Sequence, residues 1–192
     1  SYLINAVLLK VFAKVNPIKF FKKILPAQIV AFSTQSSAGT LPVATEILTD
    51  KIGVSGKVAN VTTPLGTTIG MPGCAGIWPI LVSLYGIYGL GINFSLTDYI
   101  TLVVVALFVS FGTAGVPGTA TVTTASVLTV MGLPLELIVL TIPISALADT
   151  GRTATNITGA MVSATIVARQ EDSLDDEIFE KEDEEENKAV TA

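Results

Sequence analysis

The fold is decided by the stretch ADTGRTATNITG, residues 148–159, a polar run inside an apolar segment of helix length. On a helix, four of its side chains stand at i, i+3, i+4 and i+7 and share one face: Asp149, Arg152, Thr153 and Asn156. A charge at the centre of a bilayer costs roughly 2.5 to 3.5 kcal/mol on insertion scales, so we expect both charges to meet a partner. Two interpretations follow: an Asp–Arg pair that locks two helices together, and a face that binds a zwitterionic solute.

Composition indicates a membrane protein. Half of the 192 residues are apolar, only 14% are charged, there is no His, and mean hydropathy is +0.66. Residues 171–186 hold eleven of the sixteen acidic side chains, whereas residues 1–170 carry nine basic and five acidic ones, a net of +4. The positive-inside rule predicts a cytoplasmic location for a cluster of five lysines: Lys10, Lys14, Lys19, Lys22 and Lys23.

Other function classes find little support in the residues. The single Cys74 excludes an internal disulfide, and no Cys and His set could hold zinc. An intramembrane hydrolase with Cys74 or Ser37 as nucleophile would lack a His or another evident base. An ion channel would need charged rings or a carbonyl filter, and the apolar flanks of the lysine cluster argue against nucleic-acid binding. We therefore predict that the protein is not an enzyme.

The chain divides into segments that predict an all-α membrane protein. Residues 1–23 read as the end of a transmembrane helix and a basic cytoplasmic loop. Residues 24–50 and 96–131 each have two apolar limbs too short to span alone, which favours re-entrant hairpins over surface loops. Residues 54–88 predict a spanning helix broken near Pro72, where a kink for packing is the alternative. Residues 135–168 form the polar helix, and the acidic tail, 169–192, is predicted to be disordered or a frayed helix.

The order of hairpin, broken helix, hairpin and polar helix suggests a duplicated plan. Both hairpin tips carry Ser, then Gly and Thr, then Pro. Such duplication is typical of inverted-repeat transporters.

Residues from about 26 to 170 resemble the C-terminal transport core of the dicarboxylate/amino acid:cation symporter family, which has the glutamate-transporter fold. The resemblance rests on the two tips, the broken helix and the pattern Asp-x-Gly-Arg-Thr-x-x-Asn. The motifs GCAGIWP (73–79) and GVPGTAT (115–121) are similar to the bacterial L-cystine uptake branch. The resemblance implies cation-coupled transport of L-cystine, or of acidic amino acids or C4-dicarboxylates, across the inner (plasma) membrane.

The resemblance also implies partners. In the family this core moves against a scaffold domain and assembles as a trimer through it. The chain starts at Ser1 without Met and is expected to be the C-terminal part of a longer protein that carries the scaffold. We therefore expect the 192 residues alone not to transport.

Site residues are assigned by the resemblance. Asp149 is expected to pair with the substrate ammonium, Arg152 with a distal carboxylate, and Thr153 and Asn156 with the remaining polar atoms. Cys74 stands where relatives that take acidic amino acids have Thr. The two tips are expected to supply backbone groups and gates through Gln35, Ser36, Ser37, Val116, Pro117, Gly118 and Thr119.

Two departures from the family pattern concern sodium. Pro72 and Ala160 stand where many members have Asp, so two carboxylates of the family's sodium sites are absent. A third, largely carbonyl site for Na⁺ as coupling ion remains a candidate at Thr68, Met71, Ser110, Phe111 and Thr113. No other cofactor is implied.

Overall fold

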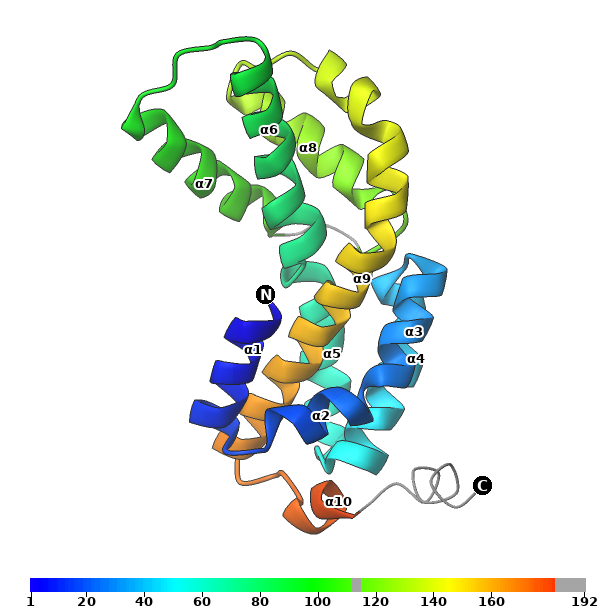
Figure 1. Ribbon diagram of the computed structural model, residues 1–192. Coiled ribbons are helices and arrows are strands. Elements are labelled where there is room, and N and C mark those ends of the chain that lie inside the picture. The colour runs from blue at the N-terminus through cyan, green and yellow to red at the C-terminus, as the bar shows by residue number, and fades with distance from the viewer. Residues whose placement is uncertain (112–114, 182–192) are drawn as a thin grey trace.

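A computed structural model describes residues 1–111 and 115–181. Within these ranges the regular elements are helices, apart from one isolated bridge between Val54 and Leu174. Figure 1 shows two lobes joined by long helices, with the N-terminal third in one lobe and α6, α7 and α8 in the other. The all-α prediction is therefore confirmed.

The first lobe is built mainly from the N-terminal third of the chain. Its elements are α1 (Tyr2–Leu8), η1 (Leu9–Ala13), α2 (Pro17–Lys23), α3 (Leu25–Thr34), α4 (Ser37–Ile47), η2 (Leu48–Ile52) and α5 (Gly56–Ile69). The helices α3 and α4 form the first hairpin. Its turn is tight because Gln35 adopts a left-handed conformation, with φ of 52°, and the Ser36 hydroxyl caps α4 by accepting the Gly39 amide at 3.0 Å.

The predicted broken helix runs from α5 through η3 (Pro72–Ile77) to α6 (Trp78–Gly89). It is interrupted at Gly70 and Met71, whose backbone angles are not helical. Pro72 lacks an amide hydrogen, so the helix restarts there without losing a donor. The interruption falls where sequence predicted it.

The second hairpin consists of α7 (Leu96–Ser110) and α8 (Thr119–Val130). A capping box starts α7, since Ser95 and Asp98 bond to each other's backbone amides. Gly118 has a φ of 86° immediately before α8, a conformation that favours glycine. Part of the tip, residues 112–114, lies outside the described residues.

The polar helix α9 (Glu136–Gln170) passes through both lobes (Figure 1). Its C-terminal half is buried in the first lobe's core with Ile157, Met161 and Ala164, whereas Leu137 joins the second lobe's core. By length and composition α9 could cross a membrane, and so could the segment 56–89. Many apolar side chains near the start of α9 are exposed, such as Leu140 and Leu147, as expected for a surface that faces lipid or another domain.

Two segments are more ordered than sequence predicted. The basic segment forms a helix, α2, because Asn16 accepts the amides of Ile18 and Lys19 and Pro17 occupies the first helical position. The acidic tail was expected to be disordered or frayed, yet residues 171–181 turn back and form α10 (Asp176–Glu180). Residues 182–192 lie outside the described part.

The tail docks through one aromatic side chain and several polar contacts. Phe179 is 1% exposed and packs in the first lobe's core. The Lys23 ammonium donates to the carbonyls of Lys51 (2.9 Å) and Lys181 (2.9 Å) and, more weakly, Ile178 (3.4 Å). The tail thus joins α2 to the end of η2. Phe179, with Leu174 packed against the same core, supplies burial that an acidic composition does not predict.

Candidate functional site

The two hairpin tips meet beside the break in the broken helix. The Ala38 amide donates to the Gly115 carbonyl at 3.0 Å, and the Ser36 hydroxyl donates to the same oxygen at 3.3 Å. A Cβ at Gly115 would lie 2.7 Å from the Thr67 carbonyl oxygen, so a larger residue would separate these elements. Two segments distant in sequence are therefore in backbone contact, next to the broken helix.

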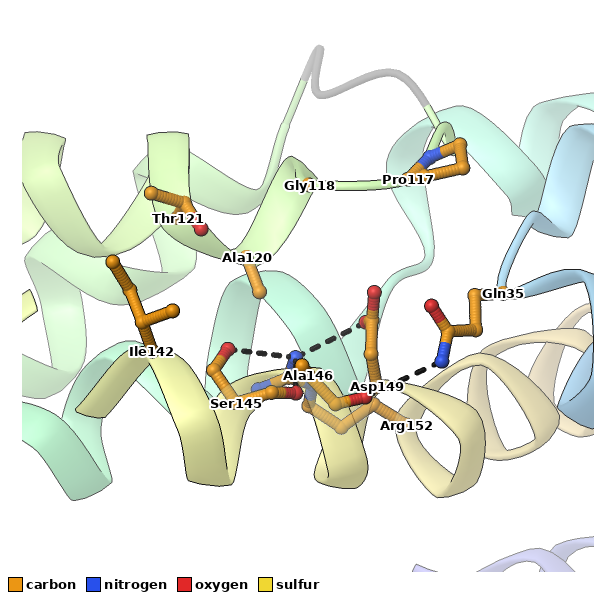
Figure 2. A pocket seen from close by; sticks show the side chains of 10 residues that line it. All are labelled: Gln35, Pro117, Gly118, Ala120, Thr121, Ile142, Ser145, Ala146, Asp149 and Arg152. Atoms are coloured by element: carbon orange, nitrogen blue, oxygen red, sulfur yellow. Dashed lines mark hydrogen bonds and ion pairs between the residues drawn. The ribbon is translucent and has the colours of Figure 1, made fainter. Parts of the chain in front are cut away.

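A cavity of about 230 Å³ lies beside these tips, over the middle of α9. Figure 2 shows Gln35 and Pro117 toward one end, Thr121 and Ile142 toward the other, and Asp149 between them. The wall is formed by Gln35, Pro117, Gly118, Ala120, Thr121, Ile142, Ser145, Ala146, Asp149 and Arg152. The first hairpin, the second hairpin and the polar helix all contribute.

The two charges of the wall are paired with each other. Arg152 Nη2 donates to Asp149 Oδ1 at 3.1 Å, and the two residues are 9% and 8% exposed. The same nitrogen also donates to the backbone oxygen (2.9 Å) and hydroxyl (3.1 Å) of Ser145. The guanidinium carbon lies 4.2 Å from the centroid of the Trp78 ring, a cation–π distance. The mutual Asp–Arg pair expected by the first interpretation is therefore present, within one helix.

The ion pair with Asp149 does not use all the N–H donors of the Arg152 guanidinium. Its Nε and Nη1 atoms are buried and, among the described residues, have no hydrogen-bond partner. A buried donor without a partner is costly, about 1 to 3 kcal/mol and more for a charged group. A carboxylate at one edge of the guanidinium would satisfy one of them, because each edge that offers two parallel N–H groups pairs Nη2 with either Nε or Nη1. The site can thus hold its own pair and accept an anionic group.

A second layer of contacts joins the broken helix to α9. Asn156 Oδ1 accepts the Gly73 amide at 2.8 Å, and Asn156 Nδ2 contacts Cys74 Sγ at 3.1 Å. The Cys74 thiol in turn faces Asp149 Oδ1 at 3.7 Å. Helix η3 also lies close to α9 because Gly73 has no side chain: a Cβ there would be 2.7 Å from the Arg152 carbonyl oxygen. These contacts hold the Asp149 carboxylate in place.

The structure brings part of the predicted substrate set to the cavity wall. Five members line it: Gln35, Pro117, Gly118, Asp149 and Arg152. Six others are not in the wall: Ser36 and Ser37 at the tip contact, Cys74 and Asn156 behind Asp149, and Thr119 and Thr153, whose hydroxyls bond to backbone carbonyls. Val116 is 51% exposed and is also not part of the wall.

Sequence reasoning missed five residues of the wall: Ala120, Thr121, Ile142, Ser145 and Ala146. A signal existed for two of them, because Ser145 and Ile142 precede Asp149 by four and seven residues and so lie on its helix face. The polar run as quoted begins at Ala148, which hid this continuation.

The residues proposed for sodium have other contacts. The Thr68 hydroxyl donates to the carbonyls of Pro64 and Leu65, and that of Ser110 to Leu107. Met71 is buried, whereas Phe111 is 60% exposed. Thr113 lies outside the described residues.

The two residues that replace the family's carboxylates border the same cavity. Pro72 and Ala160 both border a cavity of about 190 Å³ with Gly66 and Gly70. In the described part of the chain, no three His, Cys, Asp or Glu side chains gather where they could hold a metal ion. Oxygen ligands for a cation at this cavity would therefore have to be uncharged.

Comparisons with known proteins agree on one group. Residues 2–170 match the family described as the sodium:dicarboxylate symporter family. The chain is 44% identical over 169 residues to an uncharacterized symporter of Haemophilus influenzae, covering 88% of this chain and 38% of that protein. It is 37% identical over 169 residues to the L-cystine uptake protein TcyP of Bacillus thuringiensis (88% of this chain, 36% of that protein). To the protein of the same name in Shouchella clausii it is 38% identical over 165 residues, covering 85% and 35%. The chain thus spans just over a third of these relatives' length.

Proposed function

Because the chain belongs to the sodium:dicarboxylate symporter family, we propose that it is the substrate-carrying core of a secondary active transporter of L-cystine. The family consists of membrane transporters, not enzymes. Membrane location and symport are therefore family properties, whereas the substrate, the coupling ion and the movement belong to the proposal. The similarity to L-cystine uptake proteins supports the choice of substrate.

One observation carries the proposal: Asp149 and Arg152 stand in the wall of a cavity in an apolar protein, with two guanidinium donors left over. An α-amino acid carries an ammonium and a carboxylate. Its ammonium would be attracted to Asp149, and a carboxylate would take one edge of the Arg152 guanidinium, Nη2 with either Nε or Nη1. Binding would then replace the Asp149–Arg152 pair by two pairs with the ligand. No charge would be left buried without a partner, so the energetic penalty of burying charge would stay small.

The tips are proposed as gates of this site. Gln35 and Ser36 belong to one tip, and Pro117 and Gly118 to the other, and the tips touch through Gly115. Separation of this contact would open the cavity beside it. We propose that the core as a whole moves elevator-like against a scaffold domain, that the complete protein is a homotrimer, and that it is a multi-pass protein of the plasma membrane.

Orientation and coupling complete the proposal. The lysines of α2 are assigned to the cytoplasmic side by the positive-inside rule, and the acidic tail is assigned to the same side because it docks on Lys23 of α2. Na⁺ is proposed as the coupling ion, held by uncharged oxygens, with fewer ions per substrate than in relatives that have both carboxylates. A flux titration of the complete protein giving three sodium ions per substrate would contradict this count.

The alternative is an acidic amino acid or C4-dicarboxylate as substrate. The Arg152 guanidinium favours it, because the side-chain carboxylate of such a ligand would satisfy one of the two unpartnered donors. The test is uptake of radiolabelled L-cystine into vesicles that contain the complete protein, with and without a sodium gradient. Unlabelled L-cystine should compete and L-aspartate should not. Competition by L-aspartate alone would establish the alternative, and no substrate-stimulated counterflow would refute transport.

A further inference from the structure

The cavity continues beyond the two charges. Ile142 and Ser145 lie seven and four residues before Asp149 on α9, and Thr121 stands on the opposite wall, on α8 (Figure 2). At a rise of 1.5 Å per residue, seven residues of helix extend about 10 Å. The wall therefore runs about 10 Å along α9 from Asp149 to Ile142. None of the residues expected to bind substrate occupies this far end.

Two hydroxyls at the far end differ from the others of their helices. Every other Ser and Thr of α8 and α9 donates its hydroxyl to a backbone carbonyl three or four residues earlier, as is usual for hydroxyls in apolar helices. Within the described residues, neither Thr121 nor Ser145 does so. The Ser145 hydroxyl instead accepts from Arg152, which leaves its hydrogen available. The two exceptions are the two that line the cavity.

We propose that Thr121, Ser145 and Ile142 form a second subsite, which receives the far head group of an elongated amino acid. The two hydroxyls can donate to its carboxylate oxygens or accept from its ammonium. Ile142, which is 51% exposed, offers apolar contact to the part of the ligand that joins the two head groups. The ligand class is a bis-amino acid with an apolar linker, and this inference rests on the proposed function.

Ligand dimensions support the assignment. The two Cα atoms of a disulfide lie about 5.5 to 6 Å apart, so with their amino and carboxyl groups the ends of L-cystine reach over roughly 8 to 10 Å. That matches the wall between Asp149 and Ile142. The four-carbon chain of aspartate, with C–C bonds near 1.5 Å, extends less than about 5 Å and would leave the far hydroxyls without a partner. The second subsite would thus favour elongated ligands such as L-cystine over short ones such as aspartate.

The test compares two ligands that share one head group. L-cystine has a second head group, whereas S-methyl-L-cysteine ends in a methyl group after the sulfur. Binding of both to the purified complete protein is measured for wild type, Thr121→Val and Ser145→Ala. Thr121→Val is the cleaner variant because Ser145 also bonds to Arg152, which both ligands use. The matched control is Thr129→Val on the same helix, whose hydroxyl donates to the Ala125 carbonyl away from the cavity.

Thr121→Val should weaken L-cystine roughly ten- to hundredfold, the effect of one hydrogen bond to a charged group, and leave S-methyl-L-cysteine unchanged. Ser145→Ala should weaken L-cystine more than S-methyl-L-cysteine, and Thr129→Val should change neither. If wild type binds L-cystine and Thr121→Val alters both ligands equally or neither, the second subsite is refuted while the proposed function stands. A wild-type protein that binds short acidic amino acids and not L-cystine would overturn both.

Discussion

Replacement of Arg152 by Ala tests the site most directly. The guanidinium can offer one edge with two donors to a ligand carboxylate, Nη2 with either Nε or Nη1, and hydrogen bonds to charged groups contribute about 1.5 to 3 kcal/mol each. Loss of both gives about 3 to 6 kcal/mol, which corresponds to a decrease in affinity of roughly 10² to 10⁴. The Asp149 carboxylate would also lose its partner at 3.1 Å. Removal of one member of a buried pair typically costs about 3 to 5 kcal/mol.

The assay is equilibrium binding of radiolabelled L-cystine to the purified complete protein, with thermal unfolding as a check on folding. Thr155→Ala is the matched control, because its hydroxyl bonds to the Gly151 carbonyl of the same helix and is not in the cavity wall. Arg152→Lys separates charge from geometry: it restores a cation without the planar fork, so affinity should recover only in part. Equal and mild effects of Arg152→Ala and Thr155→Ala would refute the role assigned to Arg152.

Three further predictions concern the tips and the tail. In the double variant Ser37→Cys with Val116→Cys, a disulfide should stop substrate exchange, and reduction of the disulfide should restore it, because the two positions flank the contact between Ala38 and Gly115. Transport that persists in the cross-linked protein would exclude the tips as gates. Phe179→Ala should lower the free energy of unfolding by about 3 to 5 kcal/mol, since Phe179 is fully buried. Glu177 is exposed, so Glu177→Ala should change the free energy of unfolding little. Equal small effects of the two substitutions would show that the tail docks without Phe179. The hydrogen bond from Arg169 lowers the pKa of Asp176, so this pair stabilises the docked tail above the ordinary pKa of an aspartate, near pH 4, and its contribution is lost as the pH falls through the lowered pKa. The difference in unfolding midpoint between wild type and Asp176→Asn should be constant from pH 5 to 7 and decrease as the pH falls below about 4, and a difference that does not decrease with acidity would contradict the role of the pair.

The sequence predicted the helical architecture because its signals are local. Pro72 and the neighbouring glycines marked the break, and the spacing from Asp149 to Asn156 marked one helix face. The cavity wall was predicted only in part, because Thr121 on α8 and Ser145 on α9 line the same cavity only as a result of tertiary packing. A helix face on one segment does not reveal which side chains oppose it. Spacing alone also gave no sign that Arg152 would lie against Trp78.

The order of the tail was missed for a different reason. Acidic composition predicts solvation, and it outweighed the few apolar positions, of which Phe179 is placed by the turn at Asp172 and by the left-handed Gly53 next to Asp175. Contacts between residues so far apart in the chain produce no periodic pattern in the sequence. The basic segment was read as a loop because its clustered lysines fit the positive-inside rule, although Asn16 caps a helix there and Pro17 occupies its first position, where proline is favoured.

The three carbonyls around Lys23 bear on how the tail would behave as ion concentrations change. Exposed pairs such as Lys19 with Glu180 weaken as ionic strength rises, because mobile ions screen them. Lys23 is 4% exposed, and its ammonium donates to backbone oxygens, which cannot be protonated or exchanged for another side chain. Dissolved ions compete poorly for such a position. In a family whose members couple transport to sodium, this anchor would keep the tail in place while salt concentrations at the membrane surface rise and fall.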